Sequence, residues 1–365
     1  MKFFYNPTGN LYINQKSSFS ANTYELVLKE EHGILKQDNI TPFKLLKPDC
    51  GWLESIEPEE HLDEVAIKIK KNIGNIKNIL CFSYKDISLA NRLKKEKLNI
   101  DVLFSSKNGI FGSDFEDMEE KTIFENLKTL NRKYDLIIIR HYLEHFGDID
   151  NVMKNLNENL NENGICFLEV PDCNEFIKNK NPLFLWEQHR YYFTYHSLLN
   201  WLINSGWNII ESYSAEYKME PSLCYLLRQS KLNKILLNLE NDFNETTINL
   251  DSKIFNDYII EWKEFFKMNS NKIALVGIGH NSDRFLQITN SRDKISYLID
   301  DAIDKQGKFI AKCRIKVTNN KELLDAKTII LLGVHPRSTY KLKNFLMSKY
   351  KFKQIYSIFK KPIKL

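Results

Sequence analysis

The feature that most constrains the fold is an apolar strand that recurs between helical segments. Tyr134–Ile139 (YDLIII) and Ile165–Val170 (ICFLEV) are the strongest examples, and residues 148–160 between them follow a helical pattern. A strand that is apolar throughout is buried on both faces, which is typical of a parallel sheet covered by helices. The sequence therefore predicts an α/β protein.

The same alternation divides the chain into four parts. We predict a small N-terminal cap with a weak hairpin over residues 1–60, a first α/β unit over 61–225, a helical connector over 226–268 and a smaller α/β unit over 269–365. Within and just before the first unit, helices are expected at 59–72, 87–98, 115–130, 148–160 and 196–205, and strands at 77–82, 100–104, 134–139, 165–170 and 207–213. A chain of 365 residues is long enough for two to three domains.

Composition restricts the compartment and the partners. The six cysteines are scattered and none forms a CxxC pair, so we expect no bound metal, no disulfide framework and a cytoplasmic protein. We find no signal peptide and no run of the roughly 18 apolar residues that a membrane span requires. The net charge of +5 is small for this length, which favours a solvated surface over a nucleic-acid groove.

The smaller α/β unit carries half of a dinucleotide-binding fingerprint. Gly277 and Gly279 follow a strand and precede a helix, and Asp300 closes the next strand. Such glycines let the backbone approach a phosphate, and an acid at the next strand end binds a ribose. The third glycine is absent, with Ser282 and Asp283 in its neighbourhood. We therefore favour a glycine turn required by strand-to-helix geometry, with a ligand site as the alternative.

The first unit contains the phrases RHYLEH (140–145), EVP (169–171) and QHRYYFT (188–194), and these resemble phrases of class I methyltransferases. In that family the fourth strand ends in a phrase of the kind R-H-x-L-E-H, and the fifth strand, after a glycine turn, ends in E-V-P. Here residues 140–145 read RHYLEH and residues 169–171 read EVP, with Gly164 between them. The family's later phrase, with a His before Tyr-Phe-Thr and a final Gly-Trp, is matched by 188–194 (QHRYYFT) and 206–207 (GW).

Within that family the chain is most similar to sugar C-methyltransferases that act on nucleotide-linked keto-deoxysugars. Those enzymes have an N-terminal zinc-binding domain, a methyltransferase domain and a C-terminal Rossmann-like domain. Residues 277–286 (GIGHNSDRFL), the pair Asp300 and Asp301, and residues 305–308 carry the likeness at the C-terminal end. The resemblance runs from about Ile79 to the C-terminus. It implies a class I methyltransferase-like Rossmann sheet followed by a second, smaller Rossmann-like domain.

The resemblance also implies S-adenosyl-L-methionine as the cofactor. The matching cofactor-binding positions are Ser83, Asp86, Ser105, Asp114, His141 and Glu144.

Two departures bear on the zinc and cofactor sites of that family. Only Cys50 lies where one of the family's N-terminal zinc cysteines would fall. One thiolate cannot complete a four-ligand zinc site. Residues 80–86 (LCFSYKD) contain no glycine, although glycine is what lets a backbone approach a ligand closely. Cys81 and Ser105 replace the acids that should bind the ammonium and the ribose, so we expect weak or lost cofactor binding.

The catalytic residues implied by the resemblance lie in residues 188–194. His189 matches the family's base, and an imidazole suits that task because its pKa lies near working pH. Gln188 stands where the family has glutamate, and Tyr192 could donate to an enolate or line the sugar pocket. A hydrogen-bonded loop histidine is an equally weighted interpretation of His189. For Glu144 the alternative is a charge favoured at the first turn of a helix.

We therefore predict a methyltransferase of sugar or surface-glycan biosynthesis that acts on a nucleotide-linked sugar or glycan precursor with His189 as base. The alternatives are a non-catalytic methyltransferase-like protein that binds a sugar nucleotide or a partner enzyme, and ligand chemistry in the C-terminal unit. The sequence leaves the acceptor atom and the oligomeric state open.

Overall fold

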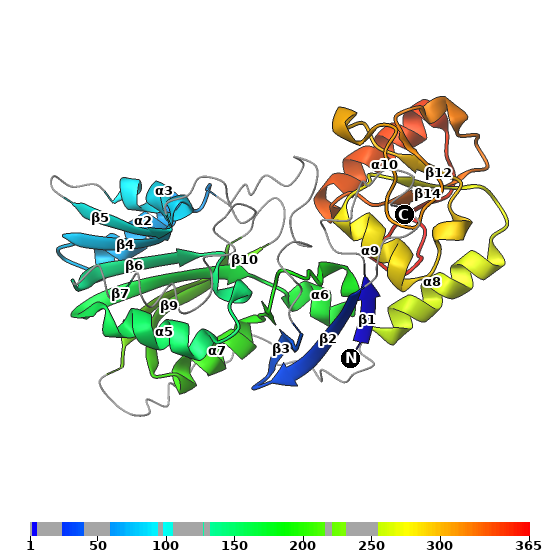
Figure 1. Cartoon of the computed structure of the whole chain (residues 1–365). Coiled ribbons are helices and arrows are strands. Elements are labelled where there is room, and N and C mark those ends of the chain that lie inside the picture. Colours follow the sequence, from blue (N-terminus) through cyan, green and yellow to red (C-terminus); the bar gives the residue numbers. More distant parts are fainter. Residues whose placement is uncertain are drawn as a thin grey trace.

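The computed structural model describes residues 2–5, 24–39, 59–93, 98–104, 127, 132–215, 221–230 and 255–365. Three sheets organise these residues: a six-stranded central sheet, a five-stranded sheet near the C-terminus, and a four-stranded sheet that contains the N-terminal strands. Figure 1 shows the central and C-terminal sheets in separate lobes, with the N-terminal strands between them. No helix among the described residues combines the length and the apolar character that crossing a membrane requires.

The central sheet has the strand order β5-β4-β6-β7-β10-β9. Its strands are β4 (Asn78–Ser83), β5 (Asn99–Phe104), β6 (Tyr134–Arg140), β7 (Leu160–Pro171), β9 (Trp207–Ala215) and β10 (Ser222–Gln229). β4, β5, β6 and β7 run parallel, whereas β10 is antiparallel to both β7 and β9. The sheet is therefore mixed. Its four neighbouring parallel strands, β4 to β7, precede β10 in the sequence.

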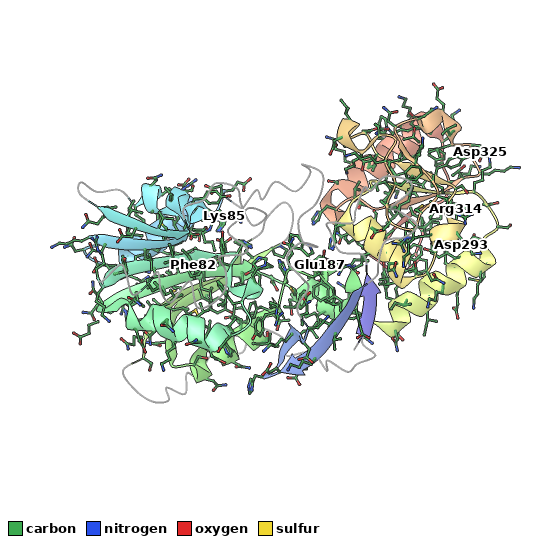
Figure 2. All side chains as sticks on the ribbon, viewed as in Figure 1. Phe82, Lys85, Glu187, Asp293, Arg314 and Asp325 are labelled. Carbon is green, nitrogen blue, oxygen red and sulfur yellow. The ribbon has the colours of Figure 1, made fainter. Side chains whose placement is uncertain are left out.

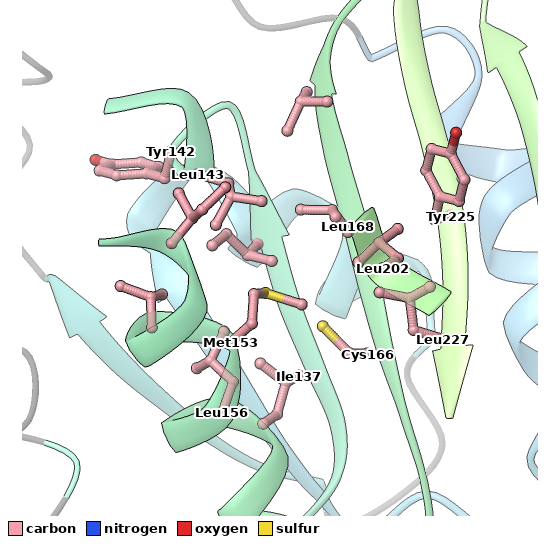
Figure 3. Close-up of a cluster of buried hydrophobic side chains, with 14 of the residues drawn as sticks. Ile137, Tyr142, Leu143, Met153, Leu156, Cys166, Leu168, Leu202, Tyr225 and Leu227 are labelled. Carbon is pink, nitrogen blue, oxygen red and sulfur yellow. The ribbon is translucent and has the colours of Figure 1, made fainter. Parts of the chain in front are cut away.

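Helices cover both faces of the central sheet, as the apolar strands require. α2 (Leu62–Asn72) and α3 (Ile87–Arg92) lie over one face, and α5 (Ile149–Glu158) and α7 (Tyr195–Asn204) over the other. Figure 3 shows Met153 and Leu156 of α5 packed toward Ile137 and Cys166 of the sheet. The residues of the two strongest predicted strands are thus buried from both sides.

The N-terminal sheet joins distant parts of the chain. β1 (Lys2–Tyr5), β2 (Tyr24–Glu31) and β3 (Ile34–Gln37) are antiparallel neighbours, and β8 (Tyr191–Tyr192) completes the sheet beside β3. The β2–β3 hairpin lies within the N-terminal region for which the sequence predicts a hairpin. Its two turn residues, His32 and Gly33, both have positive φ, which matches the right-handed twist of the strands.

The C-terminal sheet is wholly parallel, with the order β13-β12-β11-β14-β15. Its strands are β11 (Ile273–Val276), β12 (Tyr297–Ile299), β13 (Val317–Thr318), β14 (Ile329–Leu332) and β15 (Ile355–Ser357). Its long helices are α8 (Asn256–Met268), α9 (His280–Ile288) and α10 (Pro336–Tyr350). A second α/β sheet separate from the first was predicted for these residues and is present.

Short helical segments occupy the loops that follow several strands. They are α6 (Asn174–Lys178), η3 (Tyr84–Asp86), η6 (Leu143–His145), η7 (Pro182–Phe184), η8 (Arg292–Lys294), η9 (Ile303–Lys305) and η10 (Lys321–Leu323). η3 and η6 matter most for the site, because they follow the neighbouring parallel strands β4 and β6 directly.

The predicted helical connector is partly wrong. Residues 226–229 belong to β10, which lies between β7 and β9, whereas α8 confirms the end of the connector. A short apolar run such as SLCYLL fits a strand or a helix equally well, and only its pairing with two strands decides between them. The rest of the connector, and the helix predicted at 115–130 apart from Leu127, lie outside the described residues.

Candidate functional site

The carboxyl ends of β4, β6 and β7 lie side by side, because these strands are parallel neighbours. β4 ends at Ser83, β6 at Arg140 and β7 at Pro171. Ligands of open α/β sheets bind at this edge. Ser83, Asp86, His141 and Glu144 were predicted as site residues, and the topology gathers all four there.

The glycine-free turn after β4 is closed by its own side chains. The Asp86 carboxylate accepts a hydrogen bond from the Ser83 N–H at 2.8 Å, and the Ser83 hydroxyl accepts one from the Lys85 N–H at 3.2 Å. This capping box begins η3 directly after the strand. The Ser83 and Lys85 N–H groups are therefore bonded within the turn itself. This is how the structure forms a turn that contains no glycine.

Asp86 is fully buried, and one of its oxygens is unsatisfied. Its Oδ1 has no hydrogen-bond partner within the described part of the chain. Burial raises the pKa of Asp86 to about 7, although the Arg140 guanidinium, the Ser83 N–H and Lys85 act in the opposite direction. An unsatisfied carboxylate oxygen at this edge suits a cationic ligand group such as an ammonium.

The raised pKa of Asp86 predicts how stability changes with pH. A carboxyl group whose pKa is about 7 folded and 3.8 unfolded favours folding below pH 3.8, and this contribution is lost as pH rises toward 7. Asp86→Asn should therefore stabilise the protein at pH 8 by about 1–4 kcal/mol and much less at pH 4. Urea unfolding at the two pH values measures the difference. Asp148→Asn, an exposed helix cap, is the control and should show no such gain.

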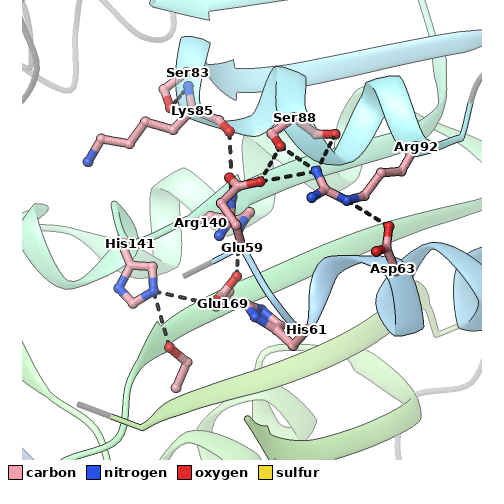
Figure 4. A network of polar contacts seen from close by, with 11 residues as sticks. Glu59, His61, Asp63, Ser83, Lys85, Ser88, Arg92, Arg140, His141 and Glu169 are labelled. Atoms are coloured by element: carbon pink, nitrogen blue, oxygen red, sulfur yellow. Dashed lines mark hydrogen bonds and ion pairs between the residues drawn. The ribbon is translucent and has the colours of Figure 1, made fainter. Parts of the chain in front are cut away.

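A buried ion pair connects the ends of β6 and β7. Arg140 Nε donates to Glu169 Oε2 at 2.6 Å, and both side chains are fully buried. Glu169 Oε1 also lies 3.1 Å from His61 Nε2 and 3.3 Å from His141 Nε2 (Figure 4). Burial alone would raise the pKa of Glu169, but Arg140 and the two histidines hold it well below its usual range. We call Arg140, Glu169, His61 and His141 the Glu169 cluster.

His141 has a strained backbone at the end of β6. Its φ is 52°, a left-handed value that non-glycine residues adopt at a cost of about 1–3 kcal/mol. This conformation brings Nε2 within 3.2 Å of the Ser222 hydroxyl, while Nδ1 lies 3.9 Å from Glu144 Oε1. His141 thus lies between Glu169 and Glu144, on the edge where the sequence predicts the cofactor.

His189 is buried beside other rings. Its ring centroid lies 4.9 Å from that of His145 and 5.0 Å from that of Trp186. His145 in turn has its Nε2 3.8 Å from Glu144 Oε1. Burial holds the pKa of His189 well below its usual range, and repulsion from His145, His141 and His280 adds to this effect. His189 is therefore a neutral imidazole at working pH, able to accept a proton.

The neighbours of His189 have partners that the sequence did not indicate. The Gln188 carbonyl oxygen accepts from His145 Nδ1 at 2.9 Å, and the Gln188 side chain is buried. Tyr192 was predicted to serve an enolate or a sugar, but its hydroxyl bonds the Trp186 backbone, with Tyr192 Oη 3.0 Å from N and 2.8 Å from O. The Tyr192 hydroxyl therefore bridges the two ends of the loop over residues 186–192.

Two of the predicted cofactor residues, Ser105 and Asp114, lie outside the described residues. Sequence reasoning missed the role of Arg140 and Glu169 and the ion pair between Glu187 and Arg284. The first pair had a usable signal, because a charged residue at or near the end of a buried strand needs a partner.

The glycine turn of the C-terminal unit has an internal structural role. Gly277 has φ 86°, and a Cβ there would lie 2.4 Å from a Val334 methyl group. Asp300 Oδ2 accepts from the Ile278 N–H at 2.7 Å and from Lys305 Nζ at 2.9 Å. Gly279 caps α9 with open space around it. Packing and internal hydrogen bonds account for Gly277 and Asp300, in line with the favoured interpretation.

Two groups of potential metal ligands occur among the described residues. One is Glu144, His145 and His189, whose ligand atoms lie within 4.8 Å of one another, and the other is His61, Glu169 and Cys224. In the second group the Arg140 guanidinium already neutralises Glu169, which disfavours a cation. That no metal is bound stays a prediction, and the first group is where a bound ion would contradict it.

Comparison with known proteins agrees with this geometry. Residues 80–212 match the family model described as a methyltransferase domain. This span begins in β4, ends in β9 and contains Asp86, Glu144, Glu169 and His189. The match covers less than half of the chain. It identifies a methyltransferase domain over these residues, in agreement with the predicted enzyme class and the predicted cofactor, S-adenosyl-L-methionine.

The solved structures that match part of this chain are distant in sequence. An S-adenosylmethionine-dependent methyltransferase from Clostridium acetobutylicum is 13% identical over 48% of this chain and 93% of its own, with a TM-score of 0.35. The 1,6-didemethyltoxoflavin-N1-methyltransferase of Burkholderia thailandensis is 11% identical over 47% of this chain and 79% of its own, with a TM-score of 0.34. At these values neither protein's substrate is carried to this chain. No curated protein matches the sequence.

Proposed function

We propose that this protein transfers a methyl group from S-adenosyl-L-methionine to a carbon next to a ketone in a nucleotide-linked sugar, with His189 as the base. The observation that carries the proposal is the position of His189. A loop after β7 brings this residue against His145 and Glu144, which follow β6. This position supports the proposal, because ligands of open α/β sheets bind at this edge.

The proposed chemistry needs a proton acceptor in a dry environment. Neutral His189 would remove the proton next to the ketone, and the resulting enolate carbon would take the methyl group. The bound cofactor supplies that methyl group on a positively charged sulfur. Burial keeps His189 uncharged, and the Glu187 carboxylate favours positive charge on this imidazole once a proton arrives.

The residues present fit the cofactor at one position in particular. Asp86 Oδ1 is buried without a partner in the described structure, so it can take the ammonium of the cofactor. The Ser83 and Lys85 N–H groups are used within the turn, and for this reason we propose that binding is weak. Free, buried cysteines in the described residues accord with work in the cytoplasm.

Calorimetry with S-adenosyl-L-methionine and S-adenosylhomocysteine tests the cofactor site. We expect saturable binding of one ligand per chain that becomes about 10- to 100-fold weaker in Asp86→Asn, because a charge-assisted hydrogen bond is worth about 1.5–3 kcal/mol. Glu144→Gln tests the other candidate for the ammonium in the same way.

The control for that titration is Asp135→Asn. Asp135 also accepts backbone hydrogen bonds, from Lys77 and Asn78, but at the amino ends of β4 and β6, opposite the site. Its affinity should equal that of the wild type. Absence of binding to the wild type at millimolar ligand would refute the proposed function.

One observation favours a second candidate, the non-catalytic methyltransferase-like protein. The turn after β4 is complete without a ligand, because its capping box uses the Ser83 and Lys85 N–H groups. In calorimetry such a protein would bind a nucleotide-linked sugar. It would give no heat of binding with S-adenosyl-L-methionine or S-adenosylhomocysteine.

A further inference from the structure

The segment that carries His189 is held by the C-terminal unit. Arg284 of α9 donates through Nη1 to the Leu185 carbonyl oxygen and through Nη2 to Glu187 Oε2, the second contact at 2.6 Å. The Arg284 side chain is 4% exposed and that of Glu187 is fully buried. Figure 2 shows Glu187 between the two lobes.

A second residue of α9 contacts the same segment. His280 lies one helical turn before Arg284, its Nε2 is 3.7 Å from Glu187 Oε2, and its ring centroid is 5.8 Å from that of Trp186. Asn181 Nδ2 also donates to the Phe359 carbonyl oxygen at 2.7 Å. The C-terminal unit therefore contacts the segment at three points before His189.

The central and N-terminal parts hold the other end of the segment. The Arg190 N–H donates to the Glu144 carbonyl oxygen at 2.6 Å, and the Arg190 carbonyl oxygen accepts from the Gln37 N–H at 2.7 Å. His189 thus lies between a residue pair fixed by α9 and a residue fixed by η6 and β3. Between these two attachments its ring lies against that of His145.

From these contacts we propose that Arg284 is a positioning residue for His189, so that the C-terminal unit sets the geometry of the methyltransferase site. A guanidinium holds two acceptors at a fixed angle, and here it joins a backbone carbonyl to a carboxylate two residues further on. A lysine at position 284 lacks this planar fork and would not fix the angle between the two acceptors. The proposal rests on the proposed role of His189, but the contacts and their test do not.

The test is a pH titration of the His189 imidazole by NMR with labelled histidine, assigned by comparison with His189→Gln. In the wild type this ring should stay neutral well below pH 6.5, because it is buried and faces other histidines. In Arg284→Met the segment loosens and His189 becomes hydrated, so its pKa should rise by about one unit or more. Arg284→Lys should give a smaller rise.

The matched control is Arg292→Met. Arg292 also ties together parts of the C-terminal unit, through Asp283, Gln287 and the Ala311 carbonyl oxygen, but no described contact joins it to the segment with His189. Its His189 titration should match the wild type. Equal titrations in Arg284→Met and Arg292→Met would overturn the proposal.

Two further measurements keep the result interpretable. If Arg284→Met does not fold, Arg284→Lys keeps the positive charge at this position and should still raise the His189 pKa. Cofactor affinity should be unchanged in Arg284→Lys, because Arg284 contacts neither Ser83 nor Asp86 in the described structure. The titration contains no methyl donor, so failure of the proposed function and failure of this inference are separately visible.

Discussion

His189→Gln should lower methyl transfer roughly 10²- to 10⁴-fold while leaving cofactor affinity unchanged. Removing a positioned general base costs a rate factor of this size. Glutamine has similar bulk but cannot take a proton. Transfer of a labelled methyl group from S-adenosyl-L-methionine to a nucleotide-linked keto-deoxysugar measures the rate, and calorimetry measures the affinity.

Deuterium exchange isolates the base from the transfer step. In heavy water without cofactor, the wild type should exchange the proton next to the ketone of the sugar, and His189→Gln should not. Because burial holds the pKa of His189 well below its usual range, exchange should not slow between pH 8 and pH 6.5. His196→Gln, on α7, is the control and should exchange normally. Undiminished exchange in His189→Gln would assign the base elsewhere.

Glu169→Gln should destabilise the central sheet by about 3–5 kcal/mol. The substitution leaves the fully buried Arg140 guanidinium without its carboxylate, and an uncompensated buried charge costs about this much. Hydrogen exchange of the β6 and β7 amides reports the local free energy of opening. Glu175→Gln removes an exposed carboxylate that pairs with Lys178. It should change the free energy of opening by less than about 1 kcal/mol.

The pH dependence of the Glu169 effect has a definite sign. The pKa of Glu169 is lowered in the folded protein, so its contribution to stability is complete above its unfolded pKa and is lost as pH falls through the folded value. The difference between wild type and Glu169→Gln should therefore be largest near pH 7 and shrink in strong acid. Arg140→Met with Glu169→Met removes both charges and should cost less than Glu169→Gln alone.

Local sequence determined most of the secondary structure of the two sheets, with β10 the exception. Residues 134–139 and 165–170 are apolar apart from Asp135 and Glu169, a pattern that favours strands buried on both faces, and the structure has them in β6 and β7. Helix α5 between them follows from its own amphipathic pattern. β10 was missed because its apolar run has no periodicity of its own, and its antiparallel place between β7 and β9 depends on those strands being present.

The composition of the site could also be anticipated, since the phrases ending β6 and β7 and the segment with His189 resemble a family pattern. The contacts among the site residues could not be anticipated. Asp86 turns back to the Ser83 N–H within three residues, but whether its other oxygen is buried depends on the surrounding helices and strands. Arg140 finds Glu169 only because the two strands are parallel neighbours.

The longest-range contacts were decided by tertiary structure alone. Arg284 and Glu187 are 97 residues apart, and neither position carries a local signal that names the other. Their ion pair exists because α9 packs against the segment between β7 and β8, which only the folded chain brings together. Local chemistry thus determined which elements form and which residue types reach the site. The packing of separate units decided which side chains meet, because a side chain's partner is set by the path of the chain in space.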